Sequence, residues 1–428
     1  MKLIIHRGTH EIGGSCIELV SANSRILLDF GLPLVDSNNE QFDSKKIRGK
    51  SKDDLIETGV LPRIKGLYRD ETPSFDAILL SHPHQDHYGL LSYANPRIPV
   101  YLSKGCRILV EVSHFFNQTG CELKNIETVE DGHSFKKGDF TITPFVVDHA
   151  GFDALGFLVE CGGKKIYYSG DFRGHGRKSK LFFKMLRNPP ENVDYLILEG
   201  TMIGRDEGQY GTEDGIETKL ASLFKSENRL FFIACSSQNI DRIVSIYRAC
   251  KESGRTFVID PYTAYILDRL KEVSEKIPQA TWGKTMKVFF VKSSHTDKLA
   301  GNKILYKYKS AKITYDEIRE AGNRLVVKSS YYLRESFARR KLMPGSKLIY
   351  SMWEGYWDKE KDFWETNSVP FEMVHCSGHA YISELQAFAG ALKPKWIIPN
   401  HTFSPEKYKE YFGRHRILQA KDGEAITL

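Results

Sequence analysis

The sequence lacks the features that mark disulfide-rich, secreted and membrane-spanning proteins. Its seven cysteines are scattered and odd in number, and no CxxC pair occurs. A disulfide framework or a cysteine zinc site is therefore not expected, and a reducing compartment fits better. No apolar run approaches the roughly 20 residues that span a bilayer. The start MKLIIHRGTHEIGG meets charge and glycine too early for a signal peptide, so we expect a cytoplasmic protein with no membrane partner.

The sequence also lacks internal repeats, low-complexity tracts and a strong excess of charge. Hydrophobic residues make up 41% and charged residues 27%, which is typical of a globular protein with a real core. The formal charge of +7 usually means a solvated surface, and it permits a polyanionic partner without requiring one. A length of 428 residues allows two domains, or one domain with a large insertion.

The first half of the chain is predicted to be rich in strands, because short apolar segments alternate there with polar or glycine-containing turns. Strands are expected at residues 16–20, 25–29, 76–80, 99–102, 140–147, 156–160, 165–169 and 195–198. From about Gly204 the pattern changes. A strand at 230–234, the loop SSQN, a helix near 241–253 and a strand at 256–259 form a βαβ unit. We therefore expect an α/β region with a parallel sheet.

The segment from Lys284 to Lys341 is locally basic, with 15 Lys and Arg against 5 Asp and Glu. One interpretation is a solvated face. The other is a track for a phosphate backbone, because five tyrosines lie among the charges. These are Tyr306, Tyr308, Tyr315, Tyr331 and Tyr332. After Lys347 a strand, a helix from Ile382 to Leu392 and a strand at 396–398 are expected.

Four side chains that can bind a metal occur within six residues, His82, His84, Asp86 and His87, directly after the apolar strand DAILL. A tight loop after a strand can direct them at one point, whereas a regular helix or strand would spread them. Imidazoles and a carboxylate suit zinc, manganese or iron, with zinc as the default ion. The alternative is a histidine-rich surface loop.

Further candidate ligands follow predicted strands later in the chain. His149 follows TPFVV, Asp171 follows IYYSG and His401 follows WIIP, at strand ends where active-site loops gather. There are then too many ligands for one tetrahedral ion, so two metals are expected. Such a pair activates a water and stabilises a phosphate or carbonyl oxygen.

The segments HPHQDH, VVDHA and YSGDFR and the late His401 resemble the ordered motifs of the metallo-β-lactamase superfamily. The resemblance implies an α/β fold, an αββα sandwich. It implies that His82, His84 and His149 bind one metal, that Asp86, His87 and His401 bind the other, and that Asp171 bridges them. Asp29 in ILLDFGLP matches the early aspartate that supports the metal loop, although an aspartate at a strand end is more often a turn former.

A second resemblance is to the β-CASP nucleases and, among them, to ribonuclease J. It is carried by Glu199 in LILEGT, by His379 in HCSGHA and by KPKWIIPNH. It implies an inserted α/β β-CASP domain at 204–350, within a discontinuous first domain at 1–203 and 351–428. The chain is expected to lack the additional C-terminal domain of that family, because it ends about 27 residues after His401.

The same resemblance implies roles for residues near a scissile phosphate. His379 would contact the phosphate or protonate the leaving group, and Glu199 would orient a ligand histidine; the alternatives are a histidine at a helix start and an exposed strand-end carboxylate. A serine-rich loop and the His-Cys-Ser-Gly segment would bind a 5′-phosphate, unless the loop is an ordinary helix cap. The candidates are Ser236, Ser237, Asn239, His375, Ser377 and Gly378. His175 is expected to line the substrate site or to be structural rather than to bind metal.

Three functions remain as hypotheses. The first is a nuclease with two divalent ions, zinc or alternatively manganese, acting on single-stranded RNA, because RNA-type β-CASP enzymes carry a histidine where His401 stands. A homodimer is compatible with this reading. The second is a small-molecule metallohydrolase, such as a phosphodiesterase or lactonase, with the insertion as a lid. The third is a non-catalytic binding subunit, which the complete ligand set disfavours.

Overall fold

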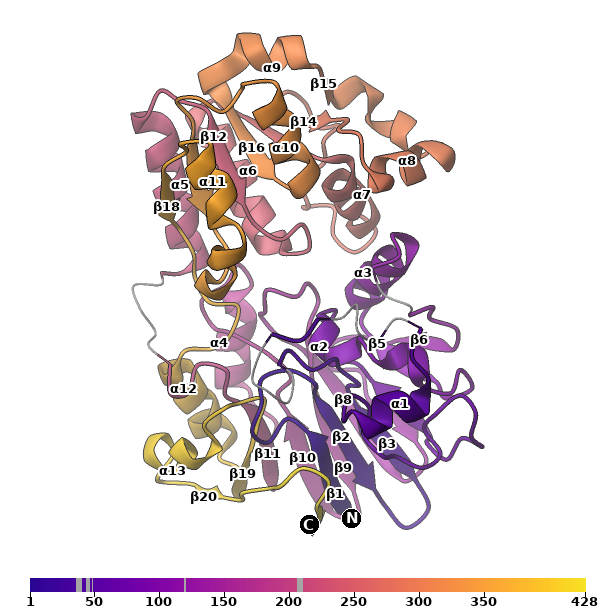
Figure 1. Cartoon of the computed structure of the whole chain (residues 1–428). Helices are drawn as coiled ribbons and strands as arrows, with labels where there is room; N and C mark the ends of the chain where they lie inside the picture. The colour runs from indigo at the N-terminus through magenta and orange to yellow at the C-terminus, as the bar shows by residue number, and fades with distance from the viewer. Residues whose placement is uncertain (36–40, 44–46, 48, 119–120, 206–210) are drawn as a thin grey trace. The chain divides into compact units, whose positions relative to one another are not determined.

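The computed structural model describes residues 1–35, 41–43, 47, 49–118, 121–205 and 211–428. The chain divides into two compact units (Figure 1), unit 1 with Met1–Gly208 and Gly378–Leu428 and unit 2 with Gln209–Ser377. The sequence predicts a return to the first domain at residue 351. This boundary needs correction, because β18 (Phe371–Met373) pairs in parallel with β17 (Lys347–Tyr350), which keeps the chain in unit 2 up to Ser377.

Unit 1 contains two seven-stranded sheets. The first has the order β21 (Ala425–Thr427), β1 (Lys2–Arg7), β2 (Cys16–Val20), β3 (Arg25–Leu28), β4 (Ala77–Leu79), β5 (Val100–Leu102) and β6 (Ile126–Thr128). The second has the order β20 (Arg416–Ile417), β19 (Trp396–Asn400), β11 (Tyr195–Glu199), β10 (Lys164–Tyr168), β9 (Leu155–Cys161), β8 (Phe140–Val146) and β7 (Phe135–Lys137).

Central strands of unit 1 are apolar on both faces because each sheet is covered on both sides. In β3, Ile26 and Leu28 pack into the core shared by the two sheets, whereas Leu27 packs into the core under the helices. In β11, Ile197 faces the shared core and Leu196 the opposite one. Each buried side chain of this kind contributes roughly 1.5–3 kcal/mol. The result is the αββα sandwich predicted from the sequence.

The helices of unit 1 form the two outer layers. They are α1 (Lys52–Glu57), α2 (Gln85–Tyr88), α3 (Lys104–Phe115), α4 (Ser179–Arg187), α12 (Ile382–Leu392) and α13 (Tyr408–Tyr411). Leu55 and Val110 place α1 and α3 on the first sheet. Phe182 and Phe388 place α4 and α12 on the second sheet, as Figure 1 also shows.

Unit 2 contains one seven-stranded sheet in which all pairs are parallel. Its order is β15 (Lys312–Ile313), β14 (Met286–Phe289), β13 (Thr256–Ile259), β16 (Leu325–Ser329), β12 (Phe231–Ala234), β17 and β18. Its helices are α5 (Glu213–Ser226), α6 (Ile240–Ser253), α7 (Pro261–Leu270), α8 (Ser294–Gly301), α9 (Tyr315–Ala321), α10 (Tyr331–Arg339) and α11 (Lys361–Thr366).

The βαβ unit predicted near residues 230–259 is β12, α6 and β13, and the prediction of a parallel sheet is confirmed. The loops after β12 and β16 leave the sheet side by side, because Ala234 pairs with Ser329 at their carboxyl ends. Among the described helices of both units, none is long and apolar enough to cross a membrane.

Candidate metal centre

Strand ends of unit 1 position every ligand predicted from the sequence. Asp29 follows β3, His82 follows β4, His149 follows β8, Asp171 follows β10 and His401 follows β19. Asp86 and His87 lie in the one-turn helix α2, whose backbone is held by the neighbouring loop, since Phe30 N donates to His87 O at 2.8 Å. The side chains are buried apart from the half-buried His84.

Three imidazoles meet around one point. Nε2 of His82 lies 3.1 Å from Nδ1 of His84, which lies 3.2 Å from Nε2 of His149. Three nitrogens bound to a tetrahedral zinc at about 2.0–2.1 Å would be separated by roughly 3.3 Å. The spacing of these atoms therefore fits the first predicted metal position.

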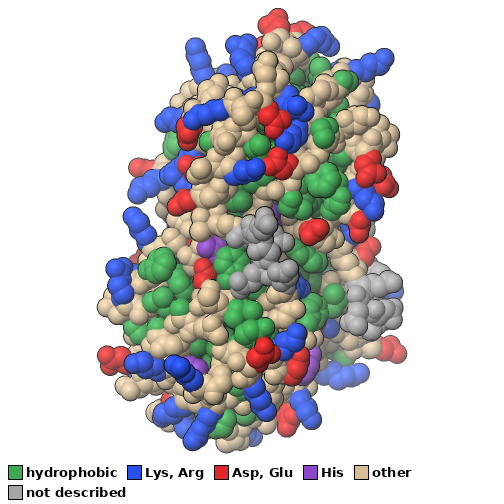
Figure 2. Space-filling view, turned by 90° about the vertical axis from the view of Figure 1, so that its left-hand side faces the viewer, with side chains coloured by type: hydrophobic (Ala, Val, Ile, Leu, Met, Phe, Trp, Pro, Cys, Tyr) green, Lys and Arg blue, Asp and Glu red, His purple; other side chains and the backbone are tan. Residues whose placement is uncertain are grey.

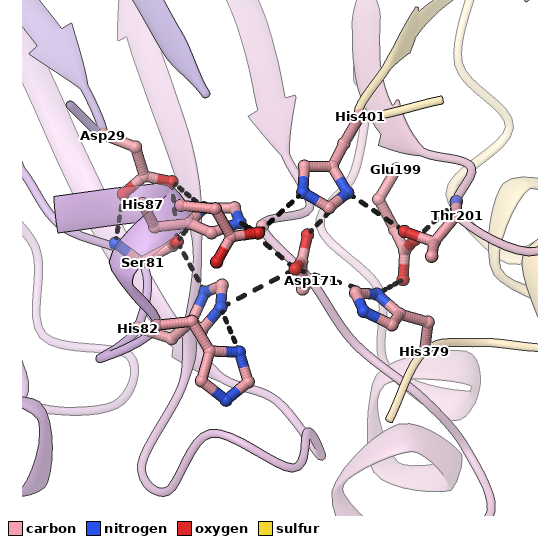
Figure 3. A network of polar contacts seen from close by, with 12 residues as sticks. Asp29, Ser81, His82, His87, Asp171, Glu199, Thr201, His379 and His401 are labelled. Carbon is pink, nitrogen blue, oxygen red and sulfur yellow. Dashed lines mark hydrogen bonds and ion pairs between the residues drawn. The ribbon is translucent and has the colours of Figure 1, made fainter. Parts of the chain in front are cut away.

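A second set of ligands lies beside the first. Oδ2 of Asp86 is 3.3 Å from Nε2 of His401 and 3.7 Å from Nε2 of His87. Oδ2 of Asp171 is 3.1 Å from Nε2 of His87 and 3.6 Å from Nε2 of His82. One carboxylate oxygen therefore borders ligands of both sets, which is the geometry required of a bridging ligand (Figure 3).

Asp29 supports the metal loop through four hydrogen bonds. Its carboxylate accepts from the amide of Ser81 at 2.7 Å, from the Ser81 hydroxyl at 2.7 Å, from Nδ1 of His87 at 2.8 Å and from the Tyr168 hydroxyl at 2.6 Å. The contact fixes the proton of His87 on Nδ1 and leaves Nε2 for the metal. Neither Ser81 nor Tyr168 was identified from the sequence.

Metal ions fit the atoms that this site leaves without hydrogen bonds. Both carboxylate oxygens of Asp171 and Nε2 of His87 are fully buried and form no hydrogen bond with any described residue, although they lie close together. Buried polar atoms in a folded protein almost always have a partner. A cation among them would supply it.

The charges of the site also fit cations. Burial lowers the pKa of His82, His84 and His149, so these imidazoles are neutral near pH 7 and ready to bind metal. Burial opposes ionisation of Asp86 too, but His87 and His401 lower its pKa to about 2.

Several carboxylates surround the second set of ligands. Their negative charge is not balanced as long as the histidines of the set are neutral. Burial lowers the pKa of His87, yet the carboxylates of Asp171, Asp29 and Asp86 raise it well above its ordinary value. Among the described residues, no lysine or arginine forms an ion pair with these three carboxylates. A divalent cation can replace the proton that the carboxylates otherwise hold on His87.

Glu199 was expected to orient a ligand histidine, and the histidine that it contacts is His379. Oε1 of Glu199 lies 3.4 Å from Nδ1 of His379, and its Oε2 accepts from the amide of Thr201 at 3.0 Å. The ligand His401 is instead contacted by Thr201, whose Oγ1 lies 3.0 Å from Nδ1 (Figure 3). Burial lowers the pKa of His379, but Glu199 and Asp171 together raise it above its ordinary value.

The backbone next to the ligands is unusually constrained. Asp29 and His401 have positive φ values of 58° and 54°, which non-glycine residues adopt at a cost. A methyl group on Gly31 would lie 1.6 Å from the carbonyl oxygen of Asp86. The chain therefore passes the metal loop at a distance that only glycine permits.

The predicted phosphate-binding residues in unit 2 have local partners. Asn239 caps α6 by accepting from the amide of Arg242 at 3.1 Å, so its side chain serves the ordinary capping role. The buried Ser237 shares a hydrogen bond of 2.9 Å with Thr263, and only Ser236 of this set is exposed. His375 and Ser377 also belong to unit 2, whereas Gly378 belongs to unit 1 and lies against Ala150.

Unit 2 contains two buried cationic residues, Arg242 and Lys328, that were not identified as such from the sequence. Nε of Arg242 lies 2.8 Å from Oε1 of Glu213, and NH1 lies 3.3 Å from Nδ1 of His375. Lys328, at the carboxyl end of β16, is 3% exposed and forms no hydrogen bond or ion pair with any described residue. Its charge was visible in the basic segment, but its burial was not.

The basic segment is not a continuous stacking surface. Tyr306, Tyr331 and Tyr332 are 70%, 63% and 41% exposed, whereas Tyr308 is 3% exposed and belongs to the core. Figure 2 shows a different face, that of α5 and β18, and there Lys and Arg side chains are interspersed with Asp and Glu. His175 of unit 1 has a structural environment, with Nδ1 2.9 Å from Glu384 and its ring stacked on Tyr381 at 4.0 Å.

The comparisons with known proteins agree with this geometry. Residues 54–221 match the family described as "Beta-lactamase superfamily domain". This segment of the chain is therefore similar to the domain that the family describes. A crystal structure titled as a protein of unknown function from Enterococcus faecalis V583 has a TM-score of 0.79 and 22% identity, covering 100% of this chain and 99% of its own. That similarity shows the fold.

The chain is also similar to proteins named ribonuclease J. It is 25% identical over 363 residues to ribonuclease J of Mycobacterium tuberculosis H37Rv, covering 80% of this chain and 61% of the relative. Ribonuclease J of Helicobacter pylori 26695 is 22% identical over 414 residues, covering 92% of this chain and 55% of the relative. The chain thus spans about three-fifths of the length of these relatives.

Proposed function

We propose that this chain is a metal-dependent nuclease that cleaves single-stranded RNA. The main support for this proposal is that two sets of candidate ligands share Asp171. Its Oδ2 lies 3.1 Å from Nε2 of His87 and 3.6 Å from Nε2 of His82. A carboxylate placed in this way could bridge two ions. The name ribonuclease J of the similar proteins points to RNA, and unit 2 would correspond to the β-CASP domain.

The residues present could hold two divalent ions. His82, His84 and His149 would bind the first ion, Asp86, His87 and His401 would bind the second, and Asp171 would lie between them. When bound, such a pair lowers the pKa of a water and neutralises charge on the phosphate oxygens. Nitrogen-rich ligands with short separations suit Zn²⁺ best, and Mn²⁺ is the alternative.

The protein itself would supply orientation and a proton. Asp29 holds the His87 ring and Thr201 holds the His401 ring, so neither needs to reorient when an ion binds. Glu199 lies 3.4 Å from Nδ1 of His379 and stabilises its protonated form. His379, 22% exposed at its side chain, could then hydrogen-bond the phosphate or protonate the leaving oxygen.

We further propose that a 5′-phosphate is recognised at the carboxyl edge of the unit 2 sheet. Lys328 supports this, because it is only 3% exposed and forms no ion pair with a described residue, and a phosphate would provide an anionic partner. The exposed Ser236 and the start of α6 follow β12, the strand that pairs with β16 beside Lys328. Helix starts and lysines together favour phosphate groups.

The test is cleavage of 5′-labelled single-stranded RNA by protein loaded with Zn²⁺ or Mn²⁺. His84→Ala should lower the rate at least about 100-fold, whereas His133→Ala, at an exposed loop histidine of the same unit, should not change it. If the wild type leaves RNA intact but hydrolyses bis(p-nitrophenyl) phosphate, the result would favour a small-molecule metallohydrolase. Fewer than two bound ions per chain would favour a binding subunit.

The phosphate proposal has its own comparison. RNA with a 5′-phosphate should be cleaved faster than the same RNA with a 5′-hydroxyl. Lys328→Gln should reduce that ratio about tenfold, since it removes one charge-assisted contact. An unchanged ratio in Lys328→Gln would contradict this part of the proposal while leaving the nuclease assignment in place.

A further inference from the structure

Three large hydrophobic side chains of unit 1 stand out among the described residues because they are exposed to solvent. Leu34 is 38%, Phe183 53% and Phe403 45% exposed. Scattered apolar residues on a surface need no explanation. Two of these three residues, however, lie near ligands of the same metal position, and this shared location calls for an explanation.

Leu34 and Phe403 lie next to Asp86 and His401. A methyl group on Gly13 would meet Cγ of Leu34 at 2.6 Å and Cβ of Asp86 at 3.2 Å, so Gly13 lies between the two side chains. Phe403 follows His401 by two residues, which limits the separation of their Cα atoms to about 7 Å. The two ligands themselves are only 3.3 Å apart. Both apolar residues therefore lie near the ligands of this metal position.

The loop that carries Phe403 is fixed on both sides of the ring. His401 N donates to Gly8 O at 2.7 Å, and the buried Thr402 accepts from Ser404 N through its hydroxyl at 3.1 Å. Beyond the ring, Gln419 donates to the carbonyl of the buried Pro405 at 2.8 Å. An ordered loop thus holds an aromatic face in water, where its burial by a ligand would be favourable.

Cations flank the ring. The guanidinium carbon of Arg205 lies 5.8 Å from the centre of the Phe403 ring, within the range of a cation–π contact. A methyl group on Gly204 would lie 3.0 Å from Nζ of Lys407 and 2.8 Å from Oγ of Ser404, so the Lys407 ammonium borders the same loop. An aromatic face with basic groups beside it is the pattern by which proteins bind single-stranded nucleic acid.

We propose that Phe403 is a specificity-determining residue that stacks on a nucleobase, the base of the nucleotide adjoining the phosphodiester at the Asp86 and His401 metal position. Arg205 and Lys407 attract the backbone of the same nucleotide, and Leu34 lies near the same ligands. This inference rests on the proposed nuclease function and adds a base-dependent contact to it. A flat aromatic ring accepts any base, so the contact distinguishes base from no base rather than one sequence from another.

The test uses the metal-loaded full chain and two octamers, one of ribo-adenylate and one of abasic ribose phosphates. The measured quantity is the ratio of kcat/KM for the two octamers. Phe403→Leu keeps an apolar side chain but removes the aromatic face, and it should reduce the ratio about tenfold, mainly through KM. Phe403→Trp should keep or raise the ratio, because the larger ring stacks better.

Phe183→Leu is the matched control, since Phe183 is an exposed phenylalanine of the same unit on α4, and its ratio should equal that of the wild type. A wild-type ratio in Phe403→Leu overturns the inference, and so does an equal loss on both octamers, which would indicate a structural role. If the wild type cleaves neither octamer but hydrolyses bis(p-nitrophenyl) phosphate, the nuclease function itself is wrong and the inference falls with it. Metal content of each variant verifies the fold.

Discussion

Asp29→Asn is the substitution that best separates metal support from folding. The side chains have nearly the same shape, and asparagine tolerates the positive φ of 58° at this position. The carboxylate accepts four hydrogen bonds, at 2.7, 2.7, 2.8 and 2.6 Å. An amide can still accept from the Ser81 backbone, but its NH₂ group would face the donors of His87 and Tyr168.

The magnitude follows from those contacts. A hydrogen bond to a charged group contributes about 1.5–3 kcal/mol. Asp29→Asn loses at least two of these bonds, those from His87 and Tyr168. We expect the metal-free protein to lose about 3 kcal/mol of unfolding free energy. Removing a partner that orients a ligand histidine lowers metal affinity about 10–100-fold, so the position of Asp86, His87 and His401 should weaken by that factor. The His82 set contacts Asp29 only through Ser81 and should change less.

The assay is a chelator competition that resolves two binding steps, together with urea unfolding of the metal-free protein. Tyr168→Phe is the control, because it removes one donor to Asp29 and leaves the contact with His87. It should cost about 1 kcal/mol and change either metal affinity less than threefold. If Asp29→Asn loses stability while both metal affinities persist, Asp29 has only a folding role and the reasoning is refuted.

Three further substitutions, one of them a control, test the packing around the site and in unit 2. Gly31→Ala should lose one of two bound metals in a metal analysis, because its methyl group would lie 1.6 Å from the Asp86 carbonyl oxygen. Gly390→Ala, in a helix with no atom within 4 Å of the added carbon, should instead gain about 0.5–1 kcal/mol in chemical unfolding. Arg242→Met should destabilise unit 2 by about 3–5 kcal/mol, since it leaves the Glu213 carboxylate buried without its partner; a cost below 1 kcal/mol in urea unfolding would contradict this reading.

The sequence revealed the parts of the site that are local in the chain. The run from His82 to His87 has an unambiguous ligand chemistry, and it follows a strand whose apolar residues are easily read. His149, Asp171 and His401 could be added because each also ends a strand. The strands themselves were predictable since burial on both faces leaves continuous apolar segments, as in β12 and β13. β1 was missed because its apolar run is followed at once by charge.

The parts that the sequence did not reveal depend on which strands are neighbours. The hydroxyl of Tyr168 reaches Asp29 across 139 residues, and Glu199 reaches His379 rather than a ligand histidine. No local pattern carries such information. The same limit explains Tyr308 and Lys328, whose residue types suggested exposure, whereas the packing of unit 2 buries both.

The position of the insertion is itself constrained by the site. Unit 2 interrupts unit 1 between Glu199 and His379, two side chains whose atoms lie 3.4 Å apart, and β11 pairs with β19 on either side of the interruption. Closing a flexible loop costs free energy that grows only with the logarithm of its length, and unit 2 has its own core. A long insertion can therefore be tolerated here, provided that unit 1 alone supplies the metal ligands. The candidate ligands meet that condition, since His401 and the six candidates before Glu199 all belong to unit 1.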